Sequence, residues 1–163
     1  MFKLAMVQMQ TAAAHKEQNL QRASFLVKKA AANKARLAVL PEVCELGWTD
    51  PAAFNQAEPV PGGSTWQCFS QLAAETGIYL CAGLAEKTDN KIFNSAVLID
   101  PQGRLLLKHR KINELHCAHD LYSQGRSLKT VSTALGCIGV MICADAAARD
   151  MVLSRSLAYM GAD

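Results

Sequence analysis

The sequence lacks the short motifs that identify several common functional classes. Its 163 residues contain no GxSxG, GxGxxG or P-loop pattern, so serine hydrolase, dinucleotide-binding and nucleotide-binding readings have no support. The net charge is only +3, and the one basic cluster, residues 108–111, has no interleaved aromatic residues. We therefore expect no nucleic-acid partner.

The six cysteines show no disulfide pattern, and the N-terminus shows no targeting pattern. No CxxC pair is present among Cys44, Cys68, Cys81, Cys117, Cys137 and Cys143. The first ten residues form a short apolar stretch interrupted by Gln8 and Gln10, which does not fit a signal peptide or a membrane span. We expect reduced thiols, a cytoplasmic location and no membrane partner.

Half of the residues are apolar and 19% are charged, which is typical of a folded globular protein. The length predicts one domain over residues 1–163. Strand patterns occupy residues 3–9, 36–40, 78–85, 92–99, 105–110, 129–133 and 136–142, and helix patterns occupy residues 16–33, 64–76 and 146–160. This alternation predicts an α/β or α+β layered fold.

Capping and turn residues predict several of the boundaries. Ser64 is a candidate N-cap of the second helix, and Gly77 is its candidate terminator. Residues 43–63 are rich in proline and glycine, which favours a loop with one helical turn near residues 52–56. The turn at residues 100–103 has Asp, Pro and Gly at the positions preferred in a type I turn.

Three residues with complementary chemistry follow predicted strands. Cys143 comes after an apolar strand and before a helix, Glu42 follows a buried strand, and Lys111 follows a third strand. A thiol at this place is a candidate nucleophile, with Glu42 as the base that accepts its proton. Lys111 and the backbone N–H of Ala144 are candidate donors to an oxyanion. Spacing alone leaves a structural alternative for each residue. Cys143 could be a core thiol, Glu42 a loop acid and Lys111 a surface cation.

Two other groups of residues have weaker interpretations. His116, Cys117, His119 and Asp120 form a compact cluster, but without a second cluster it does not predict a metal site, and we expect it near the mouth of the site. Trp48 and Trp66 are candidate pocket residues, although the helical spacing around Trp66 favours the core.

Three blocks of the sequence resemble the signature blocks of the nitrilase superfamily of carbon–nitrogen hydrolases. They are Leu40-Pro41-Glu42, His109-Arg110-Lys111-Ile112 and Gly139-Val140-Met141-Ile142-Cys143-Ala144-Asp145. Asn94-Ser95 and Tyr122-Ser123-Gln124-Gly125 also resemble the family. The order, spacing and strand-end placement of the blocks make the resemblance specific.

The resemblance implies a Glu–Lys–Cys triad of Glu42, Lys111 and Cys143. It also implies a second acid, for which Glu114 is the candidate of full length and Asp120 the shorter alternative. The implied reaction is hydrolysis of an amide, carbamoyl or nitrile substrate through a cysteine thioester, without a metal or organic cofactor. For Asp145 we expect a capping or ion-pairing role.

The resemblance further implies a four-layer α-β-β-α sandwich of which this chain represents the N-terminal part, incomplete at the C-terminus. After Asp163 the pattern predicts another buried strand, so we expect uncovered apolar surface. Natural truncation, a partial sequence and completion by another chain are open explanations. The alternative to an enzyme is an inactive structural or interaction remnant of the fold. A homo-oligomer is expected in either case.

Overall fold

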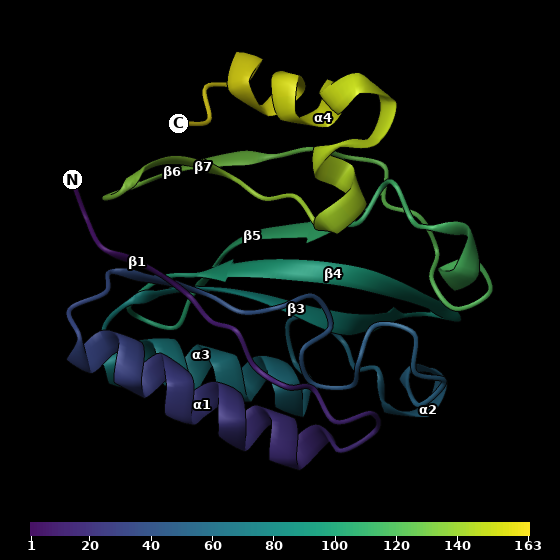
Figure 1. Cartoon of the computed structure of the whole chain (residues 1–163), viewed down its shortest axis with the longest axis horizontal. Coiled ribbons are helices and arrows are strands. Elements are labelled where there is room, and N and C mark those ends of the chain that lie inside the picture. Colours follow the sequence, from purple (N-terminus) through teal and green to yellow (C-terminus); the bar gives the residue numbers. More distant parts are fainter.

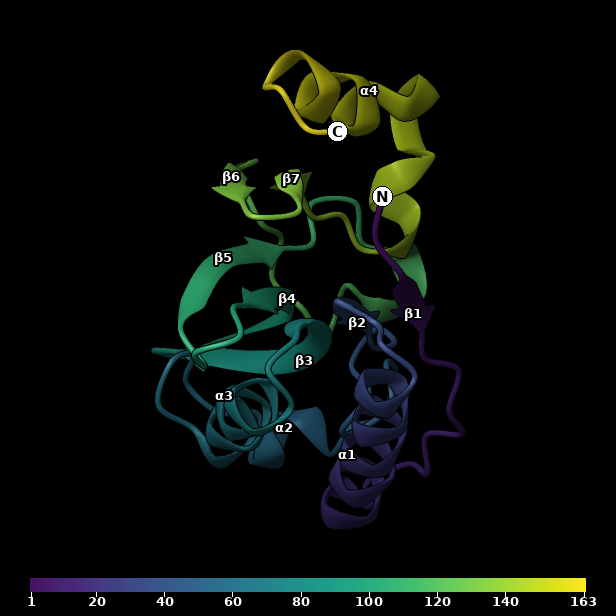
Figure 2. The same ribbon diagram turned by 90° about the vertical axis from the view of Figure 1, so that its left-hand side faces the viewer.

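The computed structural model describes residues 1–163 and has four layers (Figure 1). Helices α1 and α3 cover one face of a five-stranded sheet, the hairpin of β6 and β7 lies over the other face, and α4 lies outside the hairpin (Figure 2). The predicted α-β-β-α layering is therefore confirmed. In chain order the elements are β1 (Leu4–Met6), α1 (Lys16–Ala32), β2 (Leu37–Val39), α2 (Ala53–Gln56), α3 (Ser64–Thr76), β3 (Tyr79–Thr88), β4 (Lys91–Ile99), β5 (Leu105–Arg110), η1 (His116–Ala118), β6 (Thr130–Thr133), β7 (Gly136–Gly139), η2 (Cys143–Ala146) and α4 (Ala148–Tyr159).

The large sheet has the strand order β1-β2-β3-β4-β5. The first three strands are parallel, because helical crossovers join them, and β3, β4 and β5 are antiparallel because short turns join them. In the second of these turns Asp100 Oδ1 accepts hydrogen bonds from the N–H groups of Gln102 and Arg104, both at 2.9 Å. The sequence of the turn therefore closes the hairpin that brings β5 to the edge of the sheet.

Two apolar clusters hold the layers together. Val27 of α1 and Phe69 of α3 pack with Leu80 of β3 on the helix side of the sheet. On the other side Leu98 of β4 packs with Val140, which follows β7. Alternate residues of one strand point to opposite faces, so the central strands contribute to both clusters.

Helix α3 has the predicted range but not the predicted cap. Gly63 is the N-cap residue, and the hydroxyl of Ser64 donates to Glu58 Oε1 at 2.8 Å. Glu58 Oε2 accepts the N–H of Thr65 at 2.9 Å, so a carboxylate from the preceding loop does the capping. The prediction of Ser64 as N-cap is wrong for this reason. At the other end Gly77 has a φ of 67°, as expected for a left-handed C-cap.

The segment around Cys143 differs from the predicted strand and helix. Strand β7 ends at Gly139, Cys143 begins the short η2 turn, and α4 begins only at Ala148. The first turn of α4 is also broken, because Arg149 has a φ of 50° and the next two residues are likewise left-handed. Asp145 accounts for the tight turn, since its Oδ2 accepts the N–H of Ile142 at 3.3 Å. The predicted continuous helix over residues 146–160 is therefore wrong at its start.

Apolar surface is uncovered at the outer elements, as expected. Met6 of β1 and Tyr159 of α4 are 81% and 94% exposed. A groove of about 650 Å³, lined mostly by apolar side chains such as Leu37, Leu98 and Leu157, runs between the sheet, the hairpin and α4. No helix in the structure has the length and apolar character needed to cross a membrane.

Candidate active site

Glu42 reaches the middle of the sheet because the backbone after β2 crosses directly over β3. The crossing point is Gly83, where a Cβ atom would lie 2.6 Å from the carbonyl oxygen of Pro41 and 2.7 Å from Glu42 Cα. Only glycine permits this approach. Lys111 arrives from the other direction, since it follows β5, and its N–H donates to the carbonyl oxygen of Asn94 at 2.8 Å.

Four side chains meet in one hydrogen-bonded cluster. Lys111 Nζ lies 2.7 Å from Glu42 Oε1 and 3.3 Å from Glu114 Oε2. Asn94 Nδ2 donates to Glu42 Oε1 at 2.6 Å and to Glu114 Oε1 at 2.7 Å. One cation and one amide therefore hold two carboxylates side by side, and Glu114, the acid expected from the resemblance, is one of them.

The cluster is buried and its lysine is charged. The side chains of Lys111 and Glu114 are 0% exposed, whereas that of Glu42 is 19% exposed. Burial alone would lower the pKa of Lys111, but the hydrogen bond and charge of Glu42, together with Glu114, outweigh burial and raise this pKa. The Trp48 ring covers the ammonium at 5.0 Å, so this tryptophan lines the site as a candidate pocket residue.

Asp145 ties the turn that carries Cys143 to the loop that carries Lys111. Its Oδ1 accepts the N–H groups of Ile112 at 3.1 Å and Asn113 at 2.8 Å, and its Oδ2 lies 2.7 Å from His109 Nε2. Burial would raise the pKa of Asp145, but the hydrogen bonds from His109 and Asn113 outweigh burial and lower it. The carboxylate therefore joins two segments more than thirty residues apart, as the expected ion-pairing role requires.

Cys143 is exposed at the start of the η2 turn. Its φ of 47° is in the left-handed region, which is strained for a residue with a Cβ atom and is common at functional positions. The thiol makes no hydrogen bond with Glu42 or Lys111. Beside it lies a cavity of about 520 Å³, lined by Glu114, Ala144 and Arg149 among others. Space for a substrate therefore adjoins both the thiol turn and the buried acid.

The other candidate residues lie outside the cluster. Asp120 is exposed and makes no hydrogen bond, so the structure places Glu114, and not Asp120, beside Lys111. His119 lines the cavity next to Cys143, with its Nε2 3.1 Å from the carbonyl oxygen of Glu114. No group of three His, Cys, Asp or Glu side chains is arranged to hold a metal ion. Trp66 packs against the core on the helix side, as its spacing predicted.

Two residues that support the site, Glu45 and His109, were given no role on the basis of the sequence. Glu45 is 1% exposed and accepts the N–H of Ala85 at 2.6 Å, and burial raises its pKa to about 7. His109 is 3% exposed and pairs with Asp145. The alternation of β5 marks His109 as inward-facing, because it shares a face with Leu107. No comparable signal marks Glu45, which lies in a segment predicted as loop.

The arrangement can be compared with known proteins. The carbon–nitrogen hydrolase family model matches residues 3–163. A nitrilase from Pyrococcus abyssi is 34% identical over 100% of this chain and 63% of its own length, and an omega-amidase NIT2 from Danio rerio is 36% identical over 88% of this chain and 55% of its own length. The chain thus spans less than two thirds of these relatives.

Solved structures show the same fold. An amidase from Nesterenkonia sp. superposes with a TM-score of 0.89 at 18% identity, over 99% of this chain and 62% of the amidase. Nit3 from Saccharomyces cerevisiae, a member of the nitrilase superfamily, superposes with a TM-score of 0.83 at 29% identity, over 95% of this chain and 60% of Nit3. Since the family model matches almost every residue and the layering agrees, this chain belongs to the nitrilase superfamily of carbon–nitrogen hydrolases.

Proposed function

We propose that this chain hydrolyses a non-peptide carbon–nitrogen bond of a small amide, carbamoyl compound or nitrile through a thioester on Cys143. The buried cluster of Glu42, Lys111 and Glu114 is the observation that carries the proposal. A buried ammonium between two carboxylates is costly to maintain, and such clusters of buried charged groups are frequent at functional sites. Relatives named as a nitrilase and as omega-amidases support the same class of bond.

In the proposed first step for an amide, Cys143 Sγ attacks the carbonyl carbon and Glu42 takes the thiol proton. The carbonyl oxygen gains the negative charge and is stabilised by Lys111 and by the N–H of Ala144. When the C–N bond breaks, Glu42 returns the proton to the leaving amine. Catalytic hydrogen bonds are often long before substrate binds, so the missing contact between Cys143 and Glu42 is compatible with this step.

The second step is hydrolysis of the thioester. Glu42 takes a proton from water as the oxygen adds to the thioester carbon. The C–S bond then breaks to release the acid, and Glu42 returns the proton to the sulfur, which restores the thiol. Glu114 does not transfer a proton in this scheme. It holds the position and charge of Lys111 together with Asn94. Every group required is a side chain or backbone N–H, so the proposal includes no metal or organic cofactor.

The second candidate is an inactive structural or interaction protein built on the same fold. The exposed apolar side chains of β1 and α4 favour association with another chain. A homo-oligomeric state and a cytoplasmic location stay predictions under both candidates.

Ammonia release from a panel of amides, carbamoyl compounds and nitriles distinguishes the hydrolase from the inactive structural protein. We expect turnover by the unmodified chain, loss of turnover in Cys143→Ala, and retained turnover in Cys117→Ala, which removes the other exposed thiol. Turnover that survives Cys143→Ala would refute the thioester. A folded oligomer of the unmodified chain without any turnover would favour the structural candidate.

The pH dependence of Cys143 alkylation tests the role of Glu42 separately. If Glu42 accepts the thiol proton, Glu42→Gln should remove the part of the alkylation rate that persists at low pH. Cys117→Ala is used as the background, so that Cys143 is the reactive exposed thiol. An alkylation profile in the parent that equals that of a free thiol would contradict activation of Cys143.

A further inference from the structure

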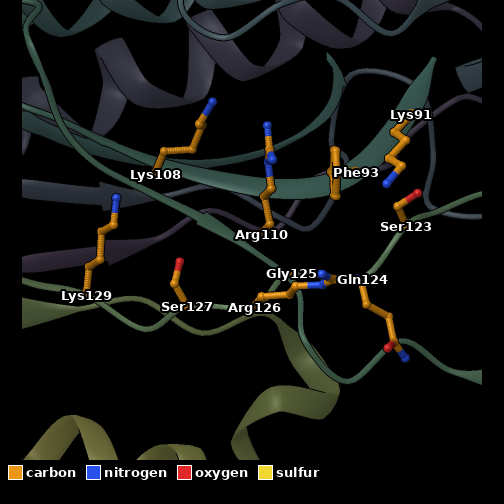
Figure 3. Close-up of a pocket in the computed structure, with 10 residues that line it drawn as sticks. All are labelled: Lys91, Phe93, Lys108, Arg110, Ser123, Gln124, Gly125, Arg126, Ser127 and Lys129. Carbon is orange, nitrogen blue, oxygen red and sulfur yellow. The ribbon is translucent and has the colours of Figure 1, made fainter. Parts of the chain in front are cut away.

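A basic groove lies at the outer edge of β5, where the chain returns along residues 123–129. It has a volume of about 700 Å³, and of its ten lining residues only Phe93 is hydrophobic. Figure 3 shows Lys108 and Arg110 of β5 above the returning segment, with the side chains of Ser127 and Lys129 extending toward β5. Five of the lining side chains are cationic: Lys91, Lys108, Arg110, Arg126 and Lys129. The chain as a whole carries a net charge of only +3, so positive charge is concentrated here.

Two of these cations are held in fixed positions by one buried carboxylate. Glu86, which is 0% exposed, accepts hydrogen bonds from Lys108 Nζ at 2.5 Å and from Arg110 Nη2 at 2.6 Å and Nε at 2.9 Å. Lys108 and Arg110 remain 26% and 31% exposed. One carboxylate neutralises one of the two charges, so the floor of the groove is ordered and still positive.

The other three cations have no partner in the chain. Lys91, Arg126 and Lys129 are exposed, and none of them takes part in an ion pair. The returning segment therefore brings unpaired positive charge to the groove.

The basic groove is distinct from the candidate active site. Lys108 and Arg110 alternate along β5 with Leu107 and His109, so their side chains lie on the opposite face of the strand from the His109–Asp145 pair. Only Gln124 lines both the basic groove and the cavity beside Cys143.

The lining selects among anionic ligands. Phe93 is 7% exposed and is covered by the Arg110 guanidinium, which lies 3.8 Å from the ring centre, so no aromatic face is available to stack a nucleobase. Several fixed and unpaired cations around one volume suit an anion with several charges on a short chain. We propose that the basic groove binds a small multivalent phosphate, recognised through its phosphate oxygens.

Calorimetric titration of the full chain with inorganic tripolyphosphate tests the site. We expect saturable binding of one ligand per chain that weakens as salt is added. Arg126→Gln combined with Lys129→Gln should weaken it at least about tenfold, because two charge-assisted contacts are lost. The matched control combines Lys29→Gln with Lys34→Gln, which removes the same charge from exposed positions outside the groove and should change affinity less than about twofold.

Three outcomes of the titrations with tripolyphosphate and oligonucleotide would overturn the proposal, and a fourth comes from ATP. They are no saturable binding of tripolyphosphate, equal weakening in the two double variants, and tighter binding of a single-stranded oligonucleotide than of tripolyphosphate. ATP and tripolyphosphate should bind alike if the phosphate chain is what the groove recognises, and a clear preference for ATP would contradict this. All four substituted side chains are exposed, so thermal unfolding should show that both variants fold. These measurements do not depend on hydrolase activity.

Discussion

The two regions that contribute to the candidate active site hold their residues in opposite ways. The side chains of Lys111 and Glu114 are fully buried and pair with each other, and Lys111 also pairs with Glu42. Cys143, by contrast, is exposed on a short turn in the left-handed region, and the first turn of the helix that follows is also left-handed. The charged part of the site is thus integral to the core, whereas the exposed turn that carries the thiol is joined to the loop after β5 through Asp145.

The same proposed reaction therefore requires burial of some of its residues and exposure of another. A buried lysine and two carboxylates are stable only as a complete set, because each charge needs its partners. A thiol has no comparable desolvation cost and can lie at the surface. Substitutions in the two regions should therefore affect stability by very different amounts.

The largest effect is expected for Lys111→Met, which leaves two carboxylates in a buried cluster without a cation. We expect a loss of about 3–5 kcal/mol in the free energy of unfolding, measured by urea denaturation at neutral pH. Lys87→Met, at an exposed lysine in β3, is the matched control and should change stability by less than about 0.5 kcal/mol. Equal effects of the two substitutions would show that the ion cluster is not part of the core.

Glu45 gives a pH test of the same buried region. Burial raises its pKa from 4.5 to about 7, so the folded state holds a proton that the unfolded state releases between these values. Stability should therefore fall by about 3 kcal/mol as the pH rises from below 4.5 to above 7.

Glu45→Gln keeps a neutral side chain at every pH and should remove this decrease. Urea denaturation of the parent and of Glu45→Gln at pH 5 and pH 8 measures the change in stability with pH. The free energy of unfolding of Glu45→Gln should increase relative to that of the parent as the pH rises. A difference between the two that does not change with pH would contradict a protonated Glu45 in the folded chain.

Asp145→Asn tests the tether between the two regions. The pKa of Asp145 is lowered mainly by His109 and the N–H of Asn113, so its contribution to stability is present at neutral pH and is lost as the pH falls below about 4. We expect the substitution to cost about 1.5–3 kcal/mol at neutral pH, since hydrogen bonds to a charged group are lost.

Asp150→Asn is the matched control for Asp145, because Asp150 is exposed and makes no hydrogen bond. It should leave unfolding unchanged. If Asp145→Asn also left the free energy of unfolding unchanged, the turn that carries Cys143 would be held by contacts other than those of this carboxylate.

Much of the sheet could be predicted from sequence because its signals are local. Apolar runs and turn residues predicted β4 and β5 and the range of α3 to within a residue or so. The errors occur where a side chain from outside the element determines its end. Glu58 caps α3 in place of Ser64, and Asp145 turns inward to His109, thirty-six residues earlier in the chain.

The candidate site, like the sheet, could be predicted from the sequence only in part. Strand-end placement marked Glu42 and Lys111 as candidates, and the resemblance implied that they act together with a second acid, Glu114 or Asp120. Choosing between Glu114 and Asp120 requires the path of the loop after Lys111, which no local pattern gives. Glu45 was not predicted because its burial results from β3 crossing beneath the loop, a tertiary contact.

The smallest effect is expected at the residue with the most important proposed role. Cys143→Ser should change the free energy of unfolding by less than about 0.5 kcal/mol, because the thiol is exposed and makes no hydrogen bond with the buried cluster. The same substitution should abolish ammonia release if the proposed thioester is correct. A large loss of stability would instead mean that the thiol is part of the packing of the turn, and the contrast with Lys111→Met would disappear. Stability and activity therefore separate the two regions: Lys111→Met affects both, whereas Cys143→Ser affects activity alone.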